Sequence, residues 1–282
     1  MAEVSAVLVR ELREKTQAGM MDCKKALQEA NGDFDAAIKY LREKGLSAAA
    51  KRADRAASQG LIDVKFNEAK TTAVLFELNS ETDFVARNDK FRALLNQLLD
   101  QVLAKEPQDI AALEAQTFLG DGSKKISDLV TDAIAVIGEN IIARRFAFFK
   151  AAPGNQLESY IHMGGTIGVL VELSAKADKT LAKDIAMHIA AASPQYLDRS
   201  AVPTEQINAE KEIYKNQLLQ DEKNKNKPAN ILDKIIEGKV NKFYQEVCLL
   251  EQAFIKEPEK NIKDILPEGV VIARFARFQL GV

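Results

Sequence analysis

The N-terminal part of the chain places apolar residues with the period of an α-helix. Over residues 4–45 they fall at i, i+3 and i+4 spacing in three short runs. Asp22 and Asp33 are candidate N-caps of the second and third runs, and Gly45 is a candidate C′ glycine of the third. The pattern predicts three helices with a thin core, followed by a helical linker over the alanine-rich residues 47–57.

A different pattern follows, and it occurs twice. Residues 74–79 (VLFELN) and 169–174 (VLVELS) are strand-like runs, each preceded by another strand-like run and a turn and followed by helical periodicity. A further strand-like run ends each half, at 145–149 (RFAFF) and 274–278 (RFARF). These similarities could arise by chance between short β-rich runs, but two pairs of similar runs in the same order favour an internal repeat. We therefore predict two antiparallel sheets, each with helices on one face.

The second half of this repeat is longer than the first, and the excess maps onto residues 204–247. Two apolar helical stripes in that segment flank a polar stretch that ends in Pro228. The stripes are the most coiled-coil-like part of the chain and predict an inserted antiparallel helical hairpin.

The predicted fold class is α+β, with a three-helix N-terminal module, two pseudo-repeated sheet-plus-helix subdomains and an inserted hairpin. The expected segments are residues 1–46 for the module, 47–57 for the linker, 58–152 for the first subdomain, 153–203 with 248–282 for the second, and 204–247 for the hairpin.

Composition restricts the function classes. The chain has 282 residues, 28% charged and 46% hydrophobic, with a formal net charge of −2, and nucleic-acid binders usually carry a basic excess. No apolar run approaches the roughly 18 residues of a membrane span, and the start has no signal-peptide pattern. Two cysteines suggest no disulfide framework. We expect a cytoplasmic protein that contacts neither membrane nor nucleic acid.

Candidate chemistry is sparse. Of the two histidines, His188 lies in a helical run, where partial burial is expected, and His162 precedes a turn. Neither has cysteine or histidine partners at metal-ligand spacing. The glycines of residues 164–168 lead into a strand rather than a helix N-terminus, so they predict a turn and not a phosphate loop. We expect no catalytic residue, no metal and no cofactor, and therefore not an enzyme.

The most informative stretch is residues 79–88. It connects a strand-like run to a helical run for which Asn88 is a candidate N-cap. Phe84 and Val85 fall in this polar connection, where a bulky apolar pair is unusual. Either the pair folds back onto the core, or Phe84 is presented to a pocket on a partner.

Two motifs resemble signatures of the elongation factor Ts family. One is residues 81–86 (ETDFVA), and the other is residues 12–27 (LREKTQAGMMDCKKAL), where Gln17 replaces the glycine usual in the family. The resemblance implies a ubiquitin-associated-like N-terminal bundle. It also implies a guanine nucleotide exchange factor that binds elongation factor Tu, disturbs its Mg²⁺ and phosphate contacts and promotes GDP release.

The resemblance also implies which residues contact elongation factor Tu. Phe84 would enter the GTPase domain near the Mg²⁺ site as an apolar wedge, and Asp83 would interact at the mouth of that groove. We expect one residue of the adjacent pair Met20 and Met21 to pack in the bundle core. In some members the hairpin dimerises, so a homodimer through it is an expectation. The full set of implied contact residues is Arg13, Met20, Met21, Thr82, Asp83, Phe84, Val85 and His162.

Two other function classes stay open at this point. A ribosome- or RNA-associated protein without exchange activity would use a basic patch made of Lys51, Arg52, Arg55, Arg144 and Arg145. An enzyme would be built around His162 and the glycine turn that follows it.

Overall fold

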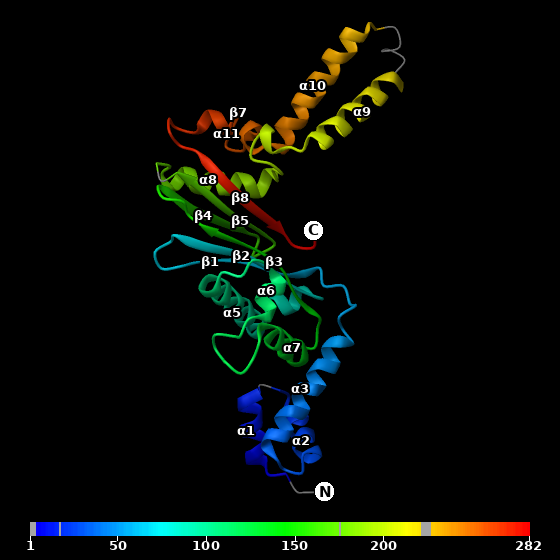
Figure 1. The fold of residues 1–282 in the computed structure, drawn as a ribbon, viewed down its shortest axis with the longest axis vertical. Coiled ribbons are helices and arrows are strands. Elements are labelled where there is room, and N and C mark those ends of the chain that lie inside the picture. Colours follow the sequence, from blue (N-terminus) through cyan, green and yellow to red (C-terminus); the bar gives the residue numbers. More distant parts are fainter. Residues whose placement is uncertain (1–3, 17, 175, 221–226) are drawn as a thin grey trace. The chain divides into compact units, whose positions relative to one another are not determined.

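The structure, a computed structural model, describes residues 4–16, 18–174, 176–220 and 227–282 (Figure 1). Contacts divide the chain into two compact units. Unit 1 comprises Met1–Lys150, Ile161–Gly168 and Phe278–Val282, and unit 2 comprises Ala151–Tyr160 and Val169–Arg277. The finer segment boundaries given above stay predictions.

Unit 1 begins with three helices, α1 (Ala6–Thr16), α2 (Met20–Glu29) and α3 (Phe34–Ala50). Their small core centres on fully buried Leu12 and Leu27. The predicted cap at Asp33 is confirmed, because its carboxylate accepts a hydrogen bond from the Ala36 amide at 2.8 Å.

Two boundaries predicted for these helices are wrong. Gly19, not Asp22, is the N-cap of α2. Asp22 lies in the first turn, where the positive end of the helix dipole stabilises a carboxylate. Gly45 does not end α3. It is buried inside the helix, where an added Cβ would lie at an ordinary contact distance, 3.5 Å, from Ala135 Cβ of α7 (Ile126–Ile137). Helix α3 ends at Ala50 and turns follow, so the helical linker is shorter than predicted.

The first sheet has the order β1-β2-β3, with β1 (Gln59–Phe66), β2 (Thr72–Ser80) and β3 (Ile141–Lys150). Both pairings are antiparallel. The connection from β2 to β3 forms helices that pack on one face of this sheet (Figure 1). They are α4 (Asp83–Ala86), α5 (Asp89–Lys105), α6 (Ile110–Ala115) and α7 (Ile126–Ile137). Phe76 of β2 and Phe91 of α5 are both fully buried in the core between them.

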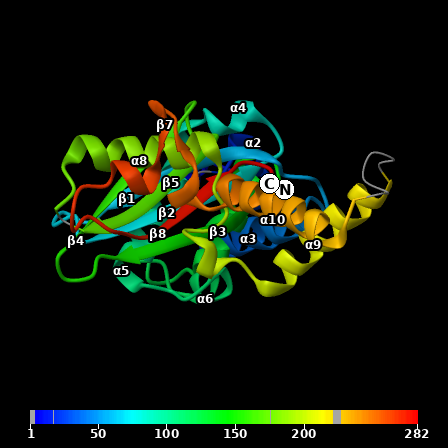
Figure 2. The same ribbon diagram turned by 90° about the horizontal axis from the view of Figure 1, so that it is seen from above.

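Unit 2 contains most of a second sheet, ordered β4-β5-β8, with β4 (Asn155–His162), β5 (Ile167–Ser174) and β8 (Ile272–Gln279). Helix α8 (Lys179–Ala192) packs on it (Figure 2), since Arg277 donates to the carbonyl of Ala190 and Lys183 donates to that of Ser159. The remaining elements are η1 (Arg199–Ala201), η3 (Leu249–Glu251), β6 (Ala253–Phe254), β7 (Glu257–Asn261) and α11 (Ile262–Ile265).

The predicted α+β class is confirmed, and so is the order of hairpin, helices and returning strand in both halves. The same ion pair links the middle strand to the returning strand in each sheet. Arg145 Nε lies 2.7 Å from Glu77 Oε2 in the first sheet, and Arg274 Nε lies 2.7 Å from Glu172 Oε2 in the second. Both carboxylates are almost fully buried. The similar sequence segments of the two halves therefore form the same buried glutamate–arginine ion pair in each sheet, which we call the clamp.

The predicted hairpin is also present, formed by α9 (Thr204–Gln220) and α10 (Ala229–Val247), which lie side by side (Figures 1 and 2). The polar tip at residues 221–226 lies outside the described residues. The base packs into unit 2, where Phe243 and Val247 share a cluster with Val202 and Cys248. Burial raises the pKa of the Cys248 thiol to about 11, so this thiol is unreactive.

We predict that the outer part of this hairpin is dispensable for folding. Replacing residues 214–240 with a short glycine-containing turn removes the outer parts of α9 and α10 but keeps Phe243 and Val247 in their cluster. The cost of closing the shortened loop is small. The variant should keep its circular dichroism spectrum and cooperative thermal unfolding. Loss of cooperative unfolding would show that the hairpin is not an insertion.

The same variant tests the predicted homodimer. Leu219 and Ile231 are large, exposed apolar residues of the hairpin. If the hairpin dimerises, light scattering should give a dimer for the full chain and a monomer for the variant. Equal masses would contradict this role.

A second prediction concerns the clamp of the second sheet. Burial alone would raise the pKa of Glu172, but hydrogen bonds from the Ala152 amide and Asn155, together with Arg274, lower it below its ordinary value. Such a group stabilises the fold above its unfolded pKa and loses that contribution as pH falls through the folded pKa. Glu172→Gln should therefore lower the free energy of unfolding by about 1–3 kcal/mol at pH 7.

Urea unfolding at a series of pH values measures this effect. The difference between wild type and Glu172→Gln should narrow as pH falls below the ordinary carboxylate value of 4.5. The exposed Glu268 gives a matched control, Glu268→Gln, with little effect at any pH. A gap that stays constant to pH 3 would contradict the prediction.

Candidate functional site

Phe84 and Val85, the apolar pair that stood out in the sequence, lie in a one-turn helix that points their side chains in different directions. Helix α4 begins at Asp83 after Thr82, and successive side chains of a helix point about 100° apart. Val85 is 9% exposed and packs in the core of unit 1, whereas Phe84 is 79% exposed. The core alternative is therefore wrong for Phe84. The expectation that Val85 contacts a partner is not supported, because its side chain faces the core.

The loop before α4 is fixed by two acidic residues. The Glu139 carboxylate accepts hydrogen bonds from the Thr82 amide at 3.0 Å and the Thr82 hydroxyl at 2.6 Å. The Glu81 carboxylate accepts one from the Asn140 amide at 2.7 Å. Glu81 and Thr82 are thus both bonded to the segment just before β3, and the position of Phe84 is set by backbone and carboxylate contacts rather than by its own packing.

Sequence reasoning missed Glu139 and Asn140. Ser80, the last residue of β2, pairs with Ile141, the first residue of β3, in an antiparallel register. The residues just before β3 must therefore lie beside those just after β2. The sequence does show two polar residues, Glu139 and Asn140, just before a strand-like run. Their contact with the motif loop can be inferred only once the register of β2 and β3 is known.

Asp83 is exposed at the start of α4 and lies 3.6 Å from Arg87 in an i, i+4 ion pair. Both side chains are more than half exposed, so this pair contributes little stability. The Asp83 carboxylate is available for a polar contact. Asn88 caps α5 through the Lys90 amide, as predicted.

The implied N-terminal contact residues lie on α1 and α2. Arg13 is exposed on α1, and Met20 and Met21 are 55% and 73% exposed in the first turn of α2. The expectation that one of these methionines packs in the bundle core is wrong. Gln17, the departure from the family pattern, lies outside the described residues.

His162 is half-buried at the end of β4, at the start of the turn into β5. The turn belongs to unit 1, and its Gly165 carbonyl accepts from the Ile62 amide of β1 at 2.8 Å. The structure therefore places the expected contact residues at three positions: the loop with α4, the N-terminal helices and this turn.

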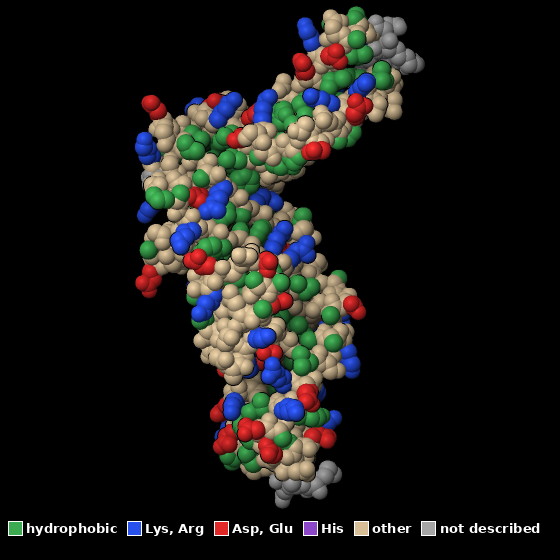
Figure 3. All heavy atoms as spheres, viewed as in Figure 1, with side chains coloured by type: hydrophobic (Ala, Val, Ile, Leu, Met, Phe, Trp, Pro, Cys, Tyr) green, Lys and Arg blue, Asp and Glu red, His purple; other side chains and the backbone are tan. Residues whose placement is uncertain are grey.

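The basic residues of the RNA alternative are largely engaged within the fold. Arg145 pairs with Glu77, Arg55 with Glu81 at 3.5 Å, and Arg52 donates to the carbonyl of Ala48. Figure 3 shows basic and acidic side chains interspersed on the face in view, not collected by sign. This arrangement does not resemble a nucleic-acid surface.

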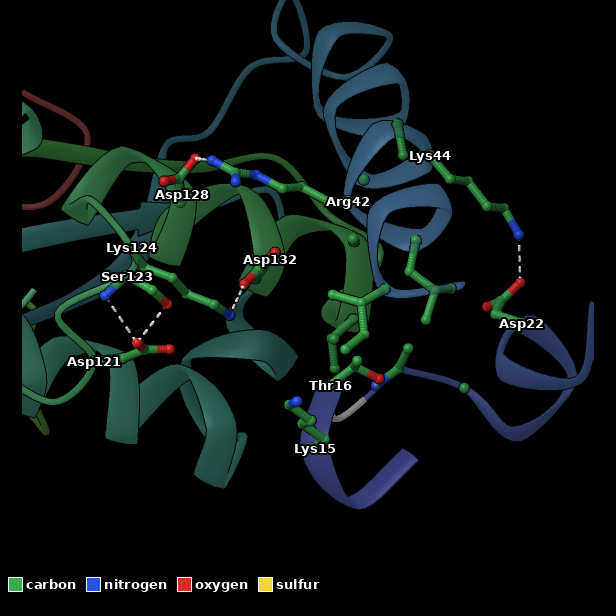
Figure 4. Close-up of a pocket in the computed structure, with 18 residues that line it drawn as sticks. Lys15, Thr16, Asp22, Arg42, Lys44, Asp121, Ser123, Lys124, Asp128 and Asp132 are labelled. Carbon is green, nitrogen blue, oxygen red and sulfur yellow. Dashed lines mark hydrogen bonds and ion pairs between the residues drawn. The ribbon is translucent and has the colours of Figure 1, made fainter. Parts of the chain in front are cut away.

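A cavity of about 420 Å³ in unit 1 lies beside α3 and α7 (Figure 4). Several of its charged groups form ion pairs: Arg42 with Asp128 at 2.8 Å, Lys124 with Asp132 at 2.6 Å, and Lys44 with Asp22. A hydrogen bond from the Lys125 amide lowers the pKa of Asp128, and Arg42 adds to this effect. Among the described residues that line the cavity there is no histidine or cysteine.

His188 lies in a helix as expected but is fully buried rather than partly buried, and a ring nitrogen lies 3.0 Å from Gln252 Oε1. Burial lowers its pKa, so it is neutral at physiological pH. Within the described residues, no group of three or more histidine, cysteine or carboxylate side chains is placed to hold a metal ion. None of the helices described is long and apolar enough to cross a membrane.

Comparison with known proteins decides the family. The family model described as Elongation factor TS matches residues 81–282, beginning at the first residue of the ETDFVA motif. The elongation factor Ts of Trichlorobacter lovleyi is 47% identical over 293 aligned residues, covering 99% of this chain and 93% of that protein. That of Halothermothrix orenii is 45% identical over 277, covering 97% and 91%. The chain belongs to the elongation factor Ts family.

Membership in the elongation factor Ts family assigns the chain to the translation elongation factors. It also agrees with the α+β fold described above. The position of the motif is then informative: the family model starts where β2 ends, at the loop that carries the exposed Phe84.

We predict that Glu139 controls the rigidity of this loop. Glu139→Ala removes both acceptors of Thr82, so hydrogen exchange of the Thr82 amide should accelerate about tenfold, the equivalent of one charge-assisted hydrogen bond of about 1.4 kcal/mol. Glu139→Gln keeps one acceptor and should have a smaller effect. Mass spectrometry or NMR of exchange measures both.

Glu68→Ala provides the control, because Glu68 is an exposed carboxylate in the β1–β2 turn. It should leave exchange at Thr82 unchanged. Equal protection of Thr82 in wild type and Glu139→Ala would show that the loop does not depend on Glu139.

Proposed function

We propose that this protein is a guanine nucleotide exchange factor that binds elongation factor Tu and promotes release of its GDP. The observation that supports this most is Phe84: an aromatic side chain, 79% exposed, on a short helix fixed by Glu81 and Glu139. Exposed aromatics on rigid supports are typical of interface hot spots. Membership in the elongation factor Ts family supplies the partner.

The proposed mechanism uses binding energy alone. A GTPase holds GDP through a phosphate-binding loop and Mg²⁺. An exchange factor binds best to a conformation of the GTPase in which those contacts are broken. Because the coupling between the two ligands is reciprocal, the factor weakens GDP binding as much as GDP weakens binding of the factor. In this mechanism Phe84 enters the GTPase domain as the apolar wedge. Asp83, exposed beside it, interacts at the mouth of the groove.

The other proposed contact residues lie at further positions on unit 1. Arg13 on α1 and Met20 and Met21 on α2 are each exposed, and flexible methionine side chains suit contact with a partner. Thr82 acts by positioning α4, since its polar atoms are bonded to Glu139. His162 adds a contact at the β4–β5 turn. In this proposal no residue of the chain carries out a chemical step.

Phe84→Ala tests the proposal. Truncating a hot-spot aromatic costs about 2 kcal/mol, which should slow catalysed GDP release roughly thirtyfold at a limiting concentration of the factor. Because Phe84 makes few contacts within the chain, the free energy of unfolding should change by less than about 0.5 kcal/mol. Fluorescence of labelled GDP on elongation factor Tu gives the rate, and urea unfolding gives the stability.

Phe91→Ala is the matched control, since Phe91 is fully buried a short distance along the chain. It should destabilise unit 1 by about 3–5 kcal/mol. Wild-type exchange by Phe84→Ala would reject the wedge mechanism. If the wild-type protein itself fails to accelerate GDP release, the exchange function is wrong.

A further inference from the structure

Residues 51–58 connect α3 to β1, and so join the three N-terminal helices to the first sheet. We call this segment the α3–β1 connection. It contains turns but no helix or strand, and Arg52 and Ala57 are half-buried while its other residues are exposed. A segment with so little burial gains little stability from packing, so its path depends on hydrogen bonds to the structure around it.

The side chain of Asn140 supplies two such bonds. Asn140 lies just before β3 and is 3% exposed, and its Nδ2 donates to the carbonyl oxygens of Arg55 at 2.8 Å and Ala53 at 3.3 Å. Because both of these neighbours are acceptors, the donating nitrogen of the amide must face the connection. The backbone amide of Asn140 donates to the Glu81 carboxylate at 2.7 Å. One residue therefore bonds the α3–β1 connection with its side chain and the loop before α4 with its backbone.

The other contacts that hold the three N-terminal helices to the sheet are weaker. Arg42 of α3 pairs with Asp128 of α7, and Arg55 pairs with Glu81, but both arginines are more than half exposed. Exposed ion pairs of this kind contribute little stability. The cavity of about 420 Å³ is lined by residues of both α3 and α7 (Figure 4), so these helices are incompletely packed against each other. The buried hydrogen bonds of Asn140 therefore matter for the orientation of the N-terminal helices.

We propose that Asn140 is a positioning residue that couples the N-terminal helices to the loop carrying Phe84. This inference rests on the proposed exchange function, in which elongation factor Tu contacts Met20 and Met21 on α2 as well as Phe84 on α4. A partner bound at one of these positions meets the other at an effective concentration set by how firmly the two are connected. Asn140 raises affinity by restricting the α3–β1 connection, and it leaves the insertion of Phe84 unchanged.

Asn140→Ala tests the structural part of this proposal. The substitution removes Nδ2 but keeps the backbone amide, so the bond to Glu81 remains. The amides of Arg52 and Arg55, which are hydrogen-bonded to the carbonyls of Ala49 and Arg52, should exchange hydrogen about three to ten times faster. Exchange at the Thr82 amide should not change. Glu139→Ala should give the reverse pattern, because the Glu139 carboxylate binds Thr82. NMR measures all three amides.

The functional part predicts different effects on KM and kcat. With the GDP complex of elongation factor Tu as the varied reactant, Asn140→Ala should raise KM about tenfold and change kcat by less than about twofold. A merely structural defect would lower the amount of folded protein, and so lower the apparent kcat at unchanged KM. If Asn140→Ala does not fold, the double substitution Ala53→Gly and Ala56→Gly loosens the connection at exposed positions and should raise KM in the same way.

A double-mutant cycle measures the coupling itself. Met21→Ala should raise KM about tenfold in the wild-type background but less than about threefold in the Asn140→Ala background, because the loosened N-terminal helices already contribute less to binding. Asn96→Ala is the matched control. Asn96 is exposed on α5, and its Nδ2 donates within that helix to the Arg92 carbonyl at 3.2 Å. This substitution should leave KM, the exchange at Arg52 and Arg55, and the effect of Met21→Ala unchanged.

The outcomes distinguish this proposal from the proposed function. If the wild-type protein promotes GDP release and Asn140→Ala leaves KM unchanged, the coupling is wrong and the exchange function stands. Equal effects of Met21→Ala in both backgrounds would also overturn the coupling. If the wild-type protein does not accelerate GDP release, the exchange function fails. Hydrogen exchange at Arg52 and Arg55 then still decides whether Asn140 holds the α3–β1 connection.

Discussion

The antiparallel pairing of β2 with β3 is the constraint on which the proposed site depends. Glu77, fully buried on β2, is bound by Arg145 of β3, and removing one partner of such a pair leaves a buried charge uncompensated. The resulting register places the residues before β3 beside those after β2. Glu139 and Asn140 can then bond the motif loop, and Phe84 projects from a fixed base. One pairing therefore links the core of the sheet to its exposed aromatic.

The same clamp recurs in the second sheet as Glu172 with Arg274, but the two halves use it differently. In the first half, Arg145 also donates to the carbonyl oxygens of Gln279 and Val282 and so binds the end of the chain to unit 1. In the second half, Glu172 accepts hydrogen bonds from Ala152, just before β4, and from Asn155, the first residue of β4. A repeated sheet has thus acquired separate local partners, with the hairpin inserted into one copy.

Sequence patterns predicted what depends on local chemistry. The caps at Asp33 and Asn88, the strand-like runs and the hairpin stripes are each readable within a few residues. Other features depend on distant residues. Gly45 resembled a helix end but lies inside α3 facing Ala135 of α7, and the missed Glu139 acts on a loop that lies far away in sequence. The misplaced cap of α2, which is Gly19 and not Asp22, is by contrast a local error. The family resemblance identified the ETDFVA motif, but only a one-turn helix explains why Phe84 is exposed and Val85 is not.

Exposed apolar side chains weaken solubility and gain nothing from burial, so a fold that keeps them must hold them where a partner can use them. A flexible loop would lose much of its binding energy to ordering on association. Here the backbone beside Phe84 is fixed by hydrogen bonds between carboxylates and backbone amides. These bonds restrict the backbone while leaving the Phe84 side chain free. A protein that shifts a nucleotide equilibrium by binding alone needs this rigidity, because energy spent on ordering its own loops cannot weaken the GDP contacts of its partner.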